Sequence, residues 1–358
     1  MIKLLKKASR IGNLALIFLL IVALLSKYLS PSLFIPINLI GMTYPFLVVL
    51  LFLYIIINLF FKQWNWFFIN IGVLLLGWIQ LTSWIQWNKT SELRADFKIL
   101  SYNVRLFDLY DWKNNIENRN KMLKFIDEQK ADIVSFQEFY YDNKDVLVDS
   151  ISQKLNMPYY YITDSKFLYG SSHFGQAIFS KFPIIKSDLI QYPNTTNMSM
   201  FCDIKINDKG IVRIFSNHLE SYRFSKADYE LAENVTDTFD LEVNKYLSIY
   251  NRMKKAMIKR SYQADKLSSY IKSSPYPVIV TGDFNDTPNS YTYYIIRGDL
   301  NDAFIESGNG VSNTYKGAFP AFRIDFILHS KEIKSQNYKR LIYNGSDHYP
   351  ISCEIILN

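Results

Sequence analysis

Two short segments in the last third of the chain combine residue types that catalyse hydrolysis. The segment VIVTGDFND (278–286) carries Asp283 and Asn285 at the end of an apolar run, and NGSDHYPIS (344–352) places Asp347 directly before His348. Hard divalent cations prefer carboxylate oxygens as ligands, and an imidazole moves protons near neutral pH. These residues predict a metal-assisted site that hydrolyses phosphoesters.

Further polar side chains follow other predicted strands. Glu138 ends the apolar run ADIVSFQE (131–138), and His218 lies near the end of IVRIFSNHL (211–219). A strand end is rigidly held and open to solvent, so that a site can be both positioned and reached there. The candidates at strand ends are Asn103, Glu138, His218, Asp283, Asn285, Asp325, Asp347 and His348.

The elements that must position these residues lie between residues 91 and 358. Helical periodicity predicts helices at 116–129 and 291–297, and one or two helices within 222–274. Many strands with helices between some of them predict two stacked sheets flanked by helices. The predicted strands are 98–108, 131–138, 159–163, 175–184, 198–206, 211–219, 278–285, 323–330 and 350–356.

From about residue 97 to residue 357 the chain resembles the endonuclease/exonuclease/phosphatase superfamily, which includes pancreatic-type deoxyribonucleases and neutral sphingomyelinases. The resemblance covers the whole part that follows the apolar N-terminal region, and its motifs occur in the family's order. They are SYN (101–103), QE (137–138), GQAIFSKFPI (175–184), SNHL (216–219), GDFND (282–286), RIDFI (323–327) and SDHYP (346–350).

The resemblance implies an α/β fold, a four-layer α/β/β/α sandwich of two mixed β-sheets with the site at one edge. It also implies a magnesium or manganese ion, with Glu138 as the main ligand, Asn103 beside it and Asp347 near the same ion.

The resemblance further implies the catalytic roles. Asp283 would orient or activate the attacking water with help from Asn285, and His218 and His348 would donate hydrogen bonds to the phosphate. Asp325 would hold His348 in one tautomer. The alternative, in which His348 is the base, stays open.

Other conspicuous residues are given structural roles. Asp302 is expected to brace a sheet, and Arg323 either meets a phosphate or pairs with a carboxylate. His173 and His329 are expected in loops or at the surface. Cys202 and Cys353 either form a disulfide or remain buried thiols, since the sequence does not fix their separation.

Residues 1–90 have a different character from the rest of the chain. They contain no Asp or Glu, and apolar runs at about 11–29, 43–61 and 65–87 predict three transmembrane helices. The chain is therefore expected to divide into a membrane region (1–90) and a catalytic domain (91–358). A cleaved signal peptide would account only for the first run.

Positive charge predicts how the chain is oriented. Lys3, Lys6, Lys7 and Arg10 precede the first apolar run, which predicts a cytoplasmic N-terminus, and three crossings would place residues 91–358 outside the cytoplasm. Two crossings would keep them inside. Residues 91–358 have equal numbers of acidic and basic residues, so the net charge of +7 does not argue for a nucleic-acid-binding surface on the catalytic part.

The expected function is that of a membrane-anchored, divalent-metal-dependent phosphoesterase, which hydrolyses phosphodiesters in the manner of a nuclease. A phospholipid- or sphingomyelin-type phosphodiesterase and a phosphate-monoester phosphatase are the alternatives, and a non-enzymatic binding protein is the contrasting class. The expected partners are a nucleic acid or a phospholipid head group as substrate, and a lipid bilayer through the N-terminal helices. No protein partner is predicted.

Overall fold

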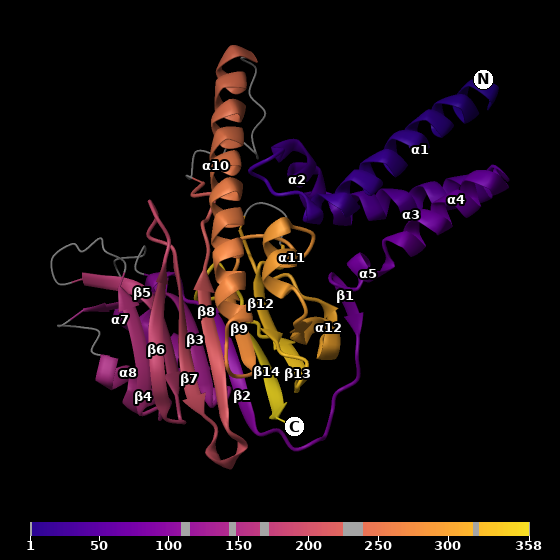
Figure 1. Cartoon of the computed structure of the whole chain (residues 1–358). Coiled ribbons are helices and arrows are strands. Elements are labelled where there is room, and N and C mark those ends of the chain that lie inside the picture. Colours follow the sequence, from indigo (N-terminus) through magenta and orange to yellow (C-terminus); the bar gives the residue numbers. More distant parts are fainter. Residues whose placement is uncertain are drawn as a thin grey trace.

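The computed structural model describes residues 2–108, 115–142, 148–164, 172–224, 239–317 and 322–357. Its main body consists of two mixed sheets that lie face to face (Figure 1). The first six-stranded sheet has the order β10 (Asn301–Asp302), β12 (Asp325–His329), β9 (Val278–Asp283), β8 (Ile211–His218), β7 (Met198–Lys205) and β6 (Ile184–Gln191).

The second six-stranded sheet has the order β13 (Ile333–Arg340), β14 (Ile351–Leu357), β2 (Phe97–Asn103), β3 (Ile133–Asp142), β5 (Ser172–Ser180) and β4 (Tyr159–Asp164). Each sheet contains one parallel pair near its middle, β2 with β3 and β8 with β9, and antiparallel neighbours otherwise. Apolar side chains that include Ile99, Met200, Ile214 and Ile279 fill the space between the sheets.

Helices cover the two outer faces. One face is covered by α7 (Asn115–Glu128) and α8 (Val148–Leu155), and the other by α10 (Phe239–Lys272) and α11 (Tyr291–Arg297). A four-residue left-handed turn with positive φ values, α6 (Arg105–Asp108), follows β2, and the short helix α12 (Ala303–Ser307) follows β10. The predicted four-layer sandwich is confirmed, and α10 extends well beyond the sheets (Figure 1). Part of the predicted helical stretch, 225–238, lies outside the described residues.

Two predicted features of the sandwich can be compared with the structure directly. Asp302 accepts hydrogen bonds from Arg323 Nη1 and Nη2 at 3.0 and 2.8 Å, which confirms its bracing role and settles the partner of Arg323 as a carboxylate. Cys202 and Cys353 are buried free thiols in the core between the sheets.

His329 contradicts the expectation of a surface or loop position. It ends β12 fully buried, and its Nε2 lies 2.8 Å from Glu306 Oε2. The apolar run that precedes it places it inside the sheet, where a carboxylate satisfies its ring. His173 lies half-buried on β5 and stacks on Tyr141.

The N-terminal region is helical, but the prediction of three transmembrane helices is wrong. Its elements are α1 (Ile2–Leu25), η1 (Ser26–Tyr28), α2 (Ile35–Met42), α3 (Tyr44–Phe60), α4 (Trp64–Leu76), α5 (Trp78–Leu81) and the strand β1 (Ile85–Trp87), which pairs with β11 (Asn309–Val311).

Length and composition decide the number of candidate spans in the described part of the chain. One helix, Lys6–Tyr28, is long and apolar enough to cross a membrane, and α2 with α3 makes a second only if their 60° bend is counted within one span. The third predicted span breaks at Gly77 after the 13 residues of α4, which is short of the roughly 20 that a crossing needs. Its last residues, Ile85 to Trp87, form β1.

These helices are docked on the sandwich at one end. Asn289, in the loop after β9, donates from Nδ2 to the carbonyls of Ala23 and Gly41 at 2.9 and 3.0 Å. Tyr28 meets the ring of Tyr294 on α11 edge to face, with centroids 4.9 Å apart. The C-terminal ends of α1 and α2 therefore lie against the sandwich, whereas the N-terminus lies at the far tip of α1 (Figure 1).

Candidate active site

A bulge within β3 positions Glu138, and the strand continues to Asp142 beyond the predicted end at residue 138. The register between β3 and β5 shifts between Gln137 and Phe139, and Glu138 takes a φ of 50°. Residues other than glycine rarely adopt this conformation, which costs free energy and is concentrated at functional sites. Both neighbours are buried, and the bulge takes the Glu138 side chain out of the regular alternation of the strand.

The turn after β9 positions Asp283. The backbone N–H of Asn285 donates to Asp283 Oδ1 at 2.8 Å, and Asn285 Nδ2 donates to Asp283 Oδ2 at 3.1 Å and to the carbonyl of Leu219 at 2.9 Å. Gly282, at φ 125°, permits the approach of β8, because a Cβ atom there would lie 2.1 Å from the carbonyl oxygen of Asn217. The carboxylate of Asp283 is thus held in one orientation.

Asn103 joins the ends of the two sheets. Its Nδ2 donates to Asp283 Oδ2 at 3.1 Å and to Glu138 Oε1 at 3.4 Å, and its Oδ1 accepts from the backbone N–H of Arg105. His218, at the end of β8, has its Nε2 3.6 Å from Glu138 Oε1 and 3.9 Å from Asp283 Oδ2. Residues from β2, β3, β8 and β9 therefore converge on one point.

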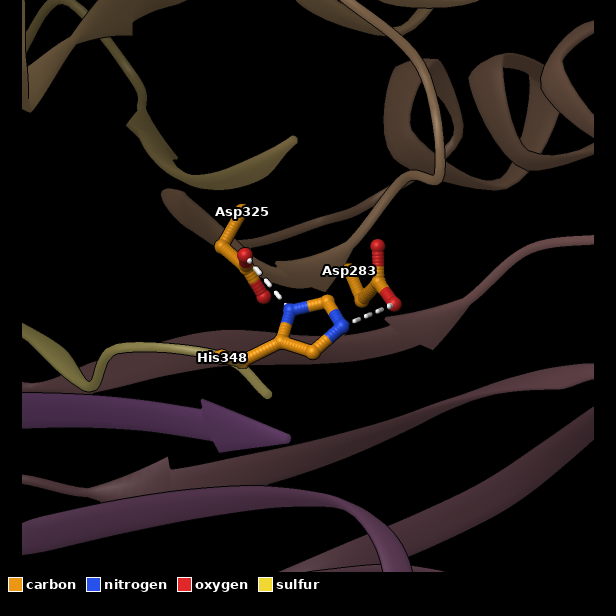
Figure 2. Close-up of side chains that lie close together, drawn as sticks. All are labelled: Asp283, Asp325 and His348. Carbon is orange, nitrogen blue, oxygen red and sulfur yellow. Dashed lines mark hydrogen bonds and ion pairs between the residues drawn. The ribbon is translucent and has the colours of Figure 1, made fainter. Parts of the chain in front are cut away.

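His348 lies between two carboxylates (Figure 2). Its Nδ1 is 2.9 Å from Asp325 Oδ2, at the start of β12, and its Nε2 is 3.7 Å from Asp283 Oδ2. The ring is buried, with 5% of its surface exposed. The Asp325 carboxylate orients the ring through Nδ1, as the resemblance implied, and turns Nε2 toward Asp283.

Burial and neighbouring charges shift the pKa values of these groups. Burial raises the pKa of Asp283 to about 6, although His348 opposes this. Burial also raises the pKa of Glu138, with a further contribution from the Asp347 carboxylate, and it lowers the pKa of His218. For His348, burial is outweighed by Asp325 and Asp283, which raise its pKa to about 10.

A cleft of about 730 Å³ opens onto this cluster. Six of the eight predicted residues line it, and the other two, Asn103 and Asp325, contact lining residues through hydrogen bonds. The six are Glu138, His218, Asp283, Asn285, Asp347 and His348. The structure therefore brings together all the residues that the sequence singled out.

The position of the helical stretch at 222–274 directly after His218 indicated that it could cover the cleft, but the sequence did not single out the apolar residues of the opposite wall. Leu39 and Met42 of α2 and Phe46 of α3 line it, as do Ile249 and Met253 of α10. These apolar residues carry no catalytic chemistry, and Leu39 lies 309 positions before His348. No local pattern in the chain could have assigned α2 and α3 to the site.

Asn103, Glu138 and Asp347 fit a hard divalent cation. Glu138 and Asp347 offer carboxylate oxygens, and Asn103 offers an amide oxygen that also accepts from the backbone N–H of Arg105. The half-buried Glu138 carboxylate is repelled by that of Asp347, so a cation would supply the missing positive charge. Arg105 Nε, 3.7 Å from Asp347 Oδ2, is a partial counter-charge that is 40% exposed.

A second group, Asp283, Asp325 and His348, also brings three ligand atoms within 4.8 Å of one another. Its His348 Nδ1 already contacts Asp325, and the two carboxylates favour a proton on the ring. A protonated imidazole has no lone pair for a metal, so an ion that binds to this group through His348 has to displace that proton.

Comparisons with known proteins agree with this arrangement. The sequence profile of the endonuclease/exonuclease/phosphatase family matches residues 100–348, and a domain of unknown function (DUF8431) matches residues 6–84. The protein angel of Drosophila melanogaster is 24% identical over an alignment of 273 positions, and the match covers 68% of this chain and 70% of that protein.

Solved structures share the fold. The catalytic domain of human Nocturnin with bound sulfate aligns with a TM-score of 0.55 at 17% identity, over 76% of this chain and 97% of that one. A family protein from Bacteroides thetaiotaomicron aligns with a TM-score of 0.51 at 18% identity, over 73% and 98%. Because its profile match spans most of the sandwich and all the clustered residues, the chain belongs to the endonuclease/exonuclease/phosphatase family of hydrolases that act on phosphoester bonds.

Proposed function

We propose that this protein is a divalent-metal-dependent phosphodiesterase that uses water as the nucleophile and is held at a membrane by its N-terminal region. The observation that carries the proposal is the convergence of Glu138, His218, Asp283 and His348 in one cleft. A phosphodiester has one negative charge fewer than a monoester, which suits a cleft in which carboxylates outnumber cationic side chains.

The metal site is proposed at Asn103, Glu138 and Asp347. Magnesium or manganese held there would polarise a phosphoryl oxygen and offset the charge that develops on it. Asn103 also donates to Glu138 and Asp283, so it ties the metal-binding residues to the catalytic carboxylate.

The remaining residues are proposed to act on the water and the phosphate. Asp283, oriented by Asn285, accepts a proton from the attacking water, whose oxygen bonds to phosphorus as the ester P–O bond breaks. His218 and His348 donate hydrogen bonds to phosphoryl oxygens, and Asp325 keeps the His348 ring in place.

We also propose that the chain divides near residue 90 into a membrane region and the catalytic domain. Separate matches to residues 6–84 and 100–348 support this division. The apolar helix at Lys6–Tyr28 supports attachment to a membrane.

The proposed orientation keeps a cytoplasmic N-terminus and places the sandwich on the other side. Arg10 Nε donates to Gln63 Oε1 at 3.1 Å, so the basic start of α1 and the turn with Lys62 lie together, away from the sandwich. Ser26 and Tyr28, at the other end of α1, contact the sandwich. A single crossing by α1 is therefore sufficient to place its basic end and the sandwich on opposite sides of a membrane. The basic end favours the cytoplasm.

The test is hydrolysis of bis(p-nitrophenyl) phosphate by the full chain in detergent, after treatment with EDTA and then with Mg²⁺ or Mn²⁺ added back. The proposal predicts that activity disappears with EDTA and returns with either ion. Activity that is insensitive to EDTA would refute the metal-dependent mechanism.

A further inference from the structure

The N-terminal helices form a wall of the active-site cleft as well as a candidate membrane anchor. Leu39, Met42 and Phe46 line the same cavity as Glu138 and Asp283. The hydroxyl of Tyr222, which also lines the cavity, contacts Met42 Sδ at 3.4 Å, and so links the segment after β8 to α2. Phe46 meets the ring of Phe322 with centroids 6.4 Å apart.

The long helix α10 contributes the facing wall. Ile249 and Met253, one turn apart, line the cavity from this side. The carboxylates and imidazoles therefore share the cleft with aliphatic and aromatic side chains from α2, α3 and α10. A cavity of about 730 Å³ has room for several methylene groups beside a phosphate.

The apolar lining continues onto the outer surface of α3. Phe46 is 47% exposed, and Val49, Leu50 and Leu53 farther along the same helix are exposed to similar degrees. Such a surface is costly in water and favourable in lipid. If α3 is immersed in lipid, this surface leads from the hydrocarbon phase to the cleft.

On the basis of the proposed function, we infer that the substrate is a phosphoester that carries an apolar chain, as a membrane lipid does, and that α2, α3 and α10 bind this chain while the carboxylates act on the phosphate. The helices would then determine substrate choice as well as location.

A nucleic acid fits the cleft less well. Binding of single strands relies on a basic groove and on aromatic surfaces that stack with bases. Arg223 is the one Lys or Arg among the described residues that line the cavity, so this lining offers little positive charge to a phosphate backbone, although aromatic rings such as Tyr222 and Tyr246 line it as well.

A matched pair of substrates tests the inference. Methyl p-nitrophenyl phosphate and octyl p-nitrophenyl phosphate have the same leaving group and charge, and differ only in the alkyl chain. The full chain, with Mg²⁺ and with each ester below its critical micelle concentration, should show a kcat/KM at least about tenfold higher for the octyl ester, since each buried methylene contributes about 0.8 kcal/mol.

Variants locate the source of this preference. Phe46→Ala should reduce the octyl-to-methyl ratio of kcat/KM several-fold. Phe52→Ala is the matched control, because Phe52 lies on the same helix, is 44% exposed against 47% for Phe46, and does not line the cavity. Ile249→Ala, on α10, repeats the test from the facing wall without altering a membrane helix.

The outcomes separate the two proposals. The inference would be overturned by an octyl-to-methyl ratio of kcat/KM near one, or by equal ratios in wild type, Phe46→Ala and Ile249→Ala. In either case the metal-dependent hydrolysis of both esters would still support the proposed function. Faster cleavage of a single-stranded oligonucleotide than of the octyl ester would also overturn it. Hydrolysis of neither ester nor the oligonucleotide by folded protein would refute the proposed function itself.

Discussion

At the scale of single residues, types and positions at strand ends were sufficient to predict the candidate site. Asp283 and His348 come from segments 65 positions apart, yet the structure places them within 3.7 Å of each other. The sequence could not predict which carboxylate contacts which ring, because the bulge at Glu138 and the turn at Asn285 depend on positive φ values that follow no simple pattern.

The metal site can be assigned by replacing one carboxylate at a time. Glu138→Gln removes a charged oxygen ligand, so we expect the affinity for Mn²⁺ to fall at least about tenfold, as measured by calorimetric titration. Asp325→Asn is the matched control, since Asp325 orients His348 in our account, and it should leave the affinity within about twofold. Loss of affinity in Asp325→Asn alone would instead place the metal at Asp283, Asp325 and His348.

The role of His348 can be separated from packing. His348→Gln keeps a polar side chain in the buried position but removes the imidazole. We expect kcat to fall by about 10² or more, the usual contribution of a positioned acid–base or hydrogen-bonding group, and the circular dichroism spectrum to be unchanged. An unfolded variant would identify His348 as a structural residue, and an unchanged kcat would exclude it from the mechanism.

At the scale of elements, the buried strands were predictable, whereas the edge strands β6, β10 and β13 were not. The central strands β2, β3 and β9 are nearly continuous apolar runs with both faces covered, which gives a strong signal. The strands β6 and β13 lie at sheet edges and carry charged residues such as Lys186 and Lys334, which protect an edge but hide the strand in the sequence.

The pair of Asp302 and Arg323 is expected to stabilise the sheet edge near β10. Both side chains are buried, so Asp302→Asn leaves Arg323 without its counter-charge, and the free energy of unfolding should fall by about 3–5 kcal/mol. Asp299→Asn, at an exposed position, should change it by less than about 0.5 kcal/mol. Thermal unfolding of both variants measures the difference, and equal melting temperatures would contradict the bracing role.

The stabilisation that Asp302 and Arg323 contribute depends on pH in a definite direction. Burial alone would raise the pKa of Asp302, but Arg323 outweighs it and lowers the pKa below its ordinary value. The stabilisation is therefore present above the ordinary Asp pKa and is lost as the pH falls through the lowered value. The difference between wild type and Asp302→Asn should shrink at acid pH.

At the scale of the whole molecule, composition predicted a membrane-like N-terminal region but not its geometry. Hydropathy alone does not register the break at Gly77 or the 60° bend between α2 and α3, so three runs of apolar residues were predicted as three spans. Nor does it show that these helices line the cleft, because that depends on docking through Asn289.

The orientation can be tested with a reporter fused after residue 358. Alkaline phosphatase, which folds only outside the cytoplasm of a bacterial host, should be active in this fusion, and a green fluorescent protein fusion at the same position should be dark. The reverse pattern would place the sandwich in the cytoplasm and refute the orientation derived from α1.

The most direct test of the central claim compares the full chain with its Asp283→Asn variant, which keeps the size of the side chain but removes the carboxylate that Asn103 and Asn285 hold in place. The measurement is the rate of Mg²⁺-dependent hydrolysis of bis(p-nitrophenyl) phosphate. The account predicts turnover by wild type and a loss of about 10² or more in the variant at equal Mg²⁺ affinity. Equal rates in the two proteins would contradict the assignment of this cleft as a phosphoesterase site.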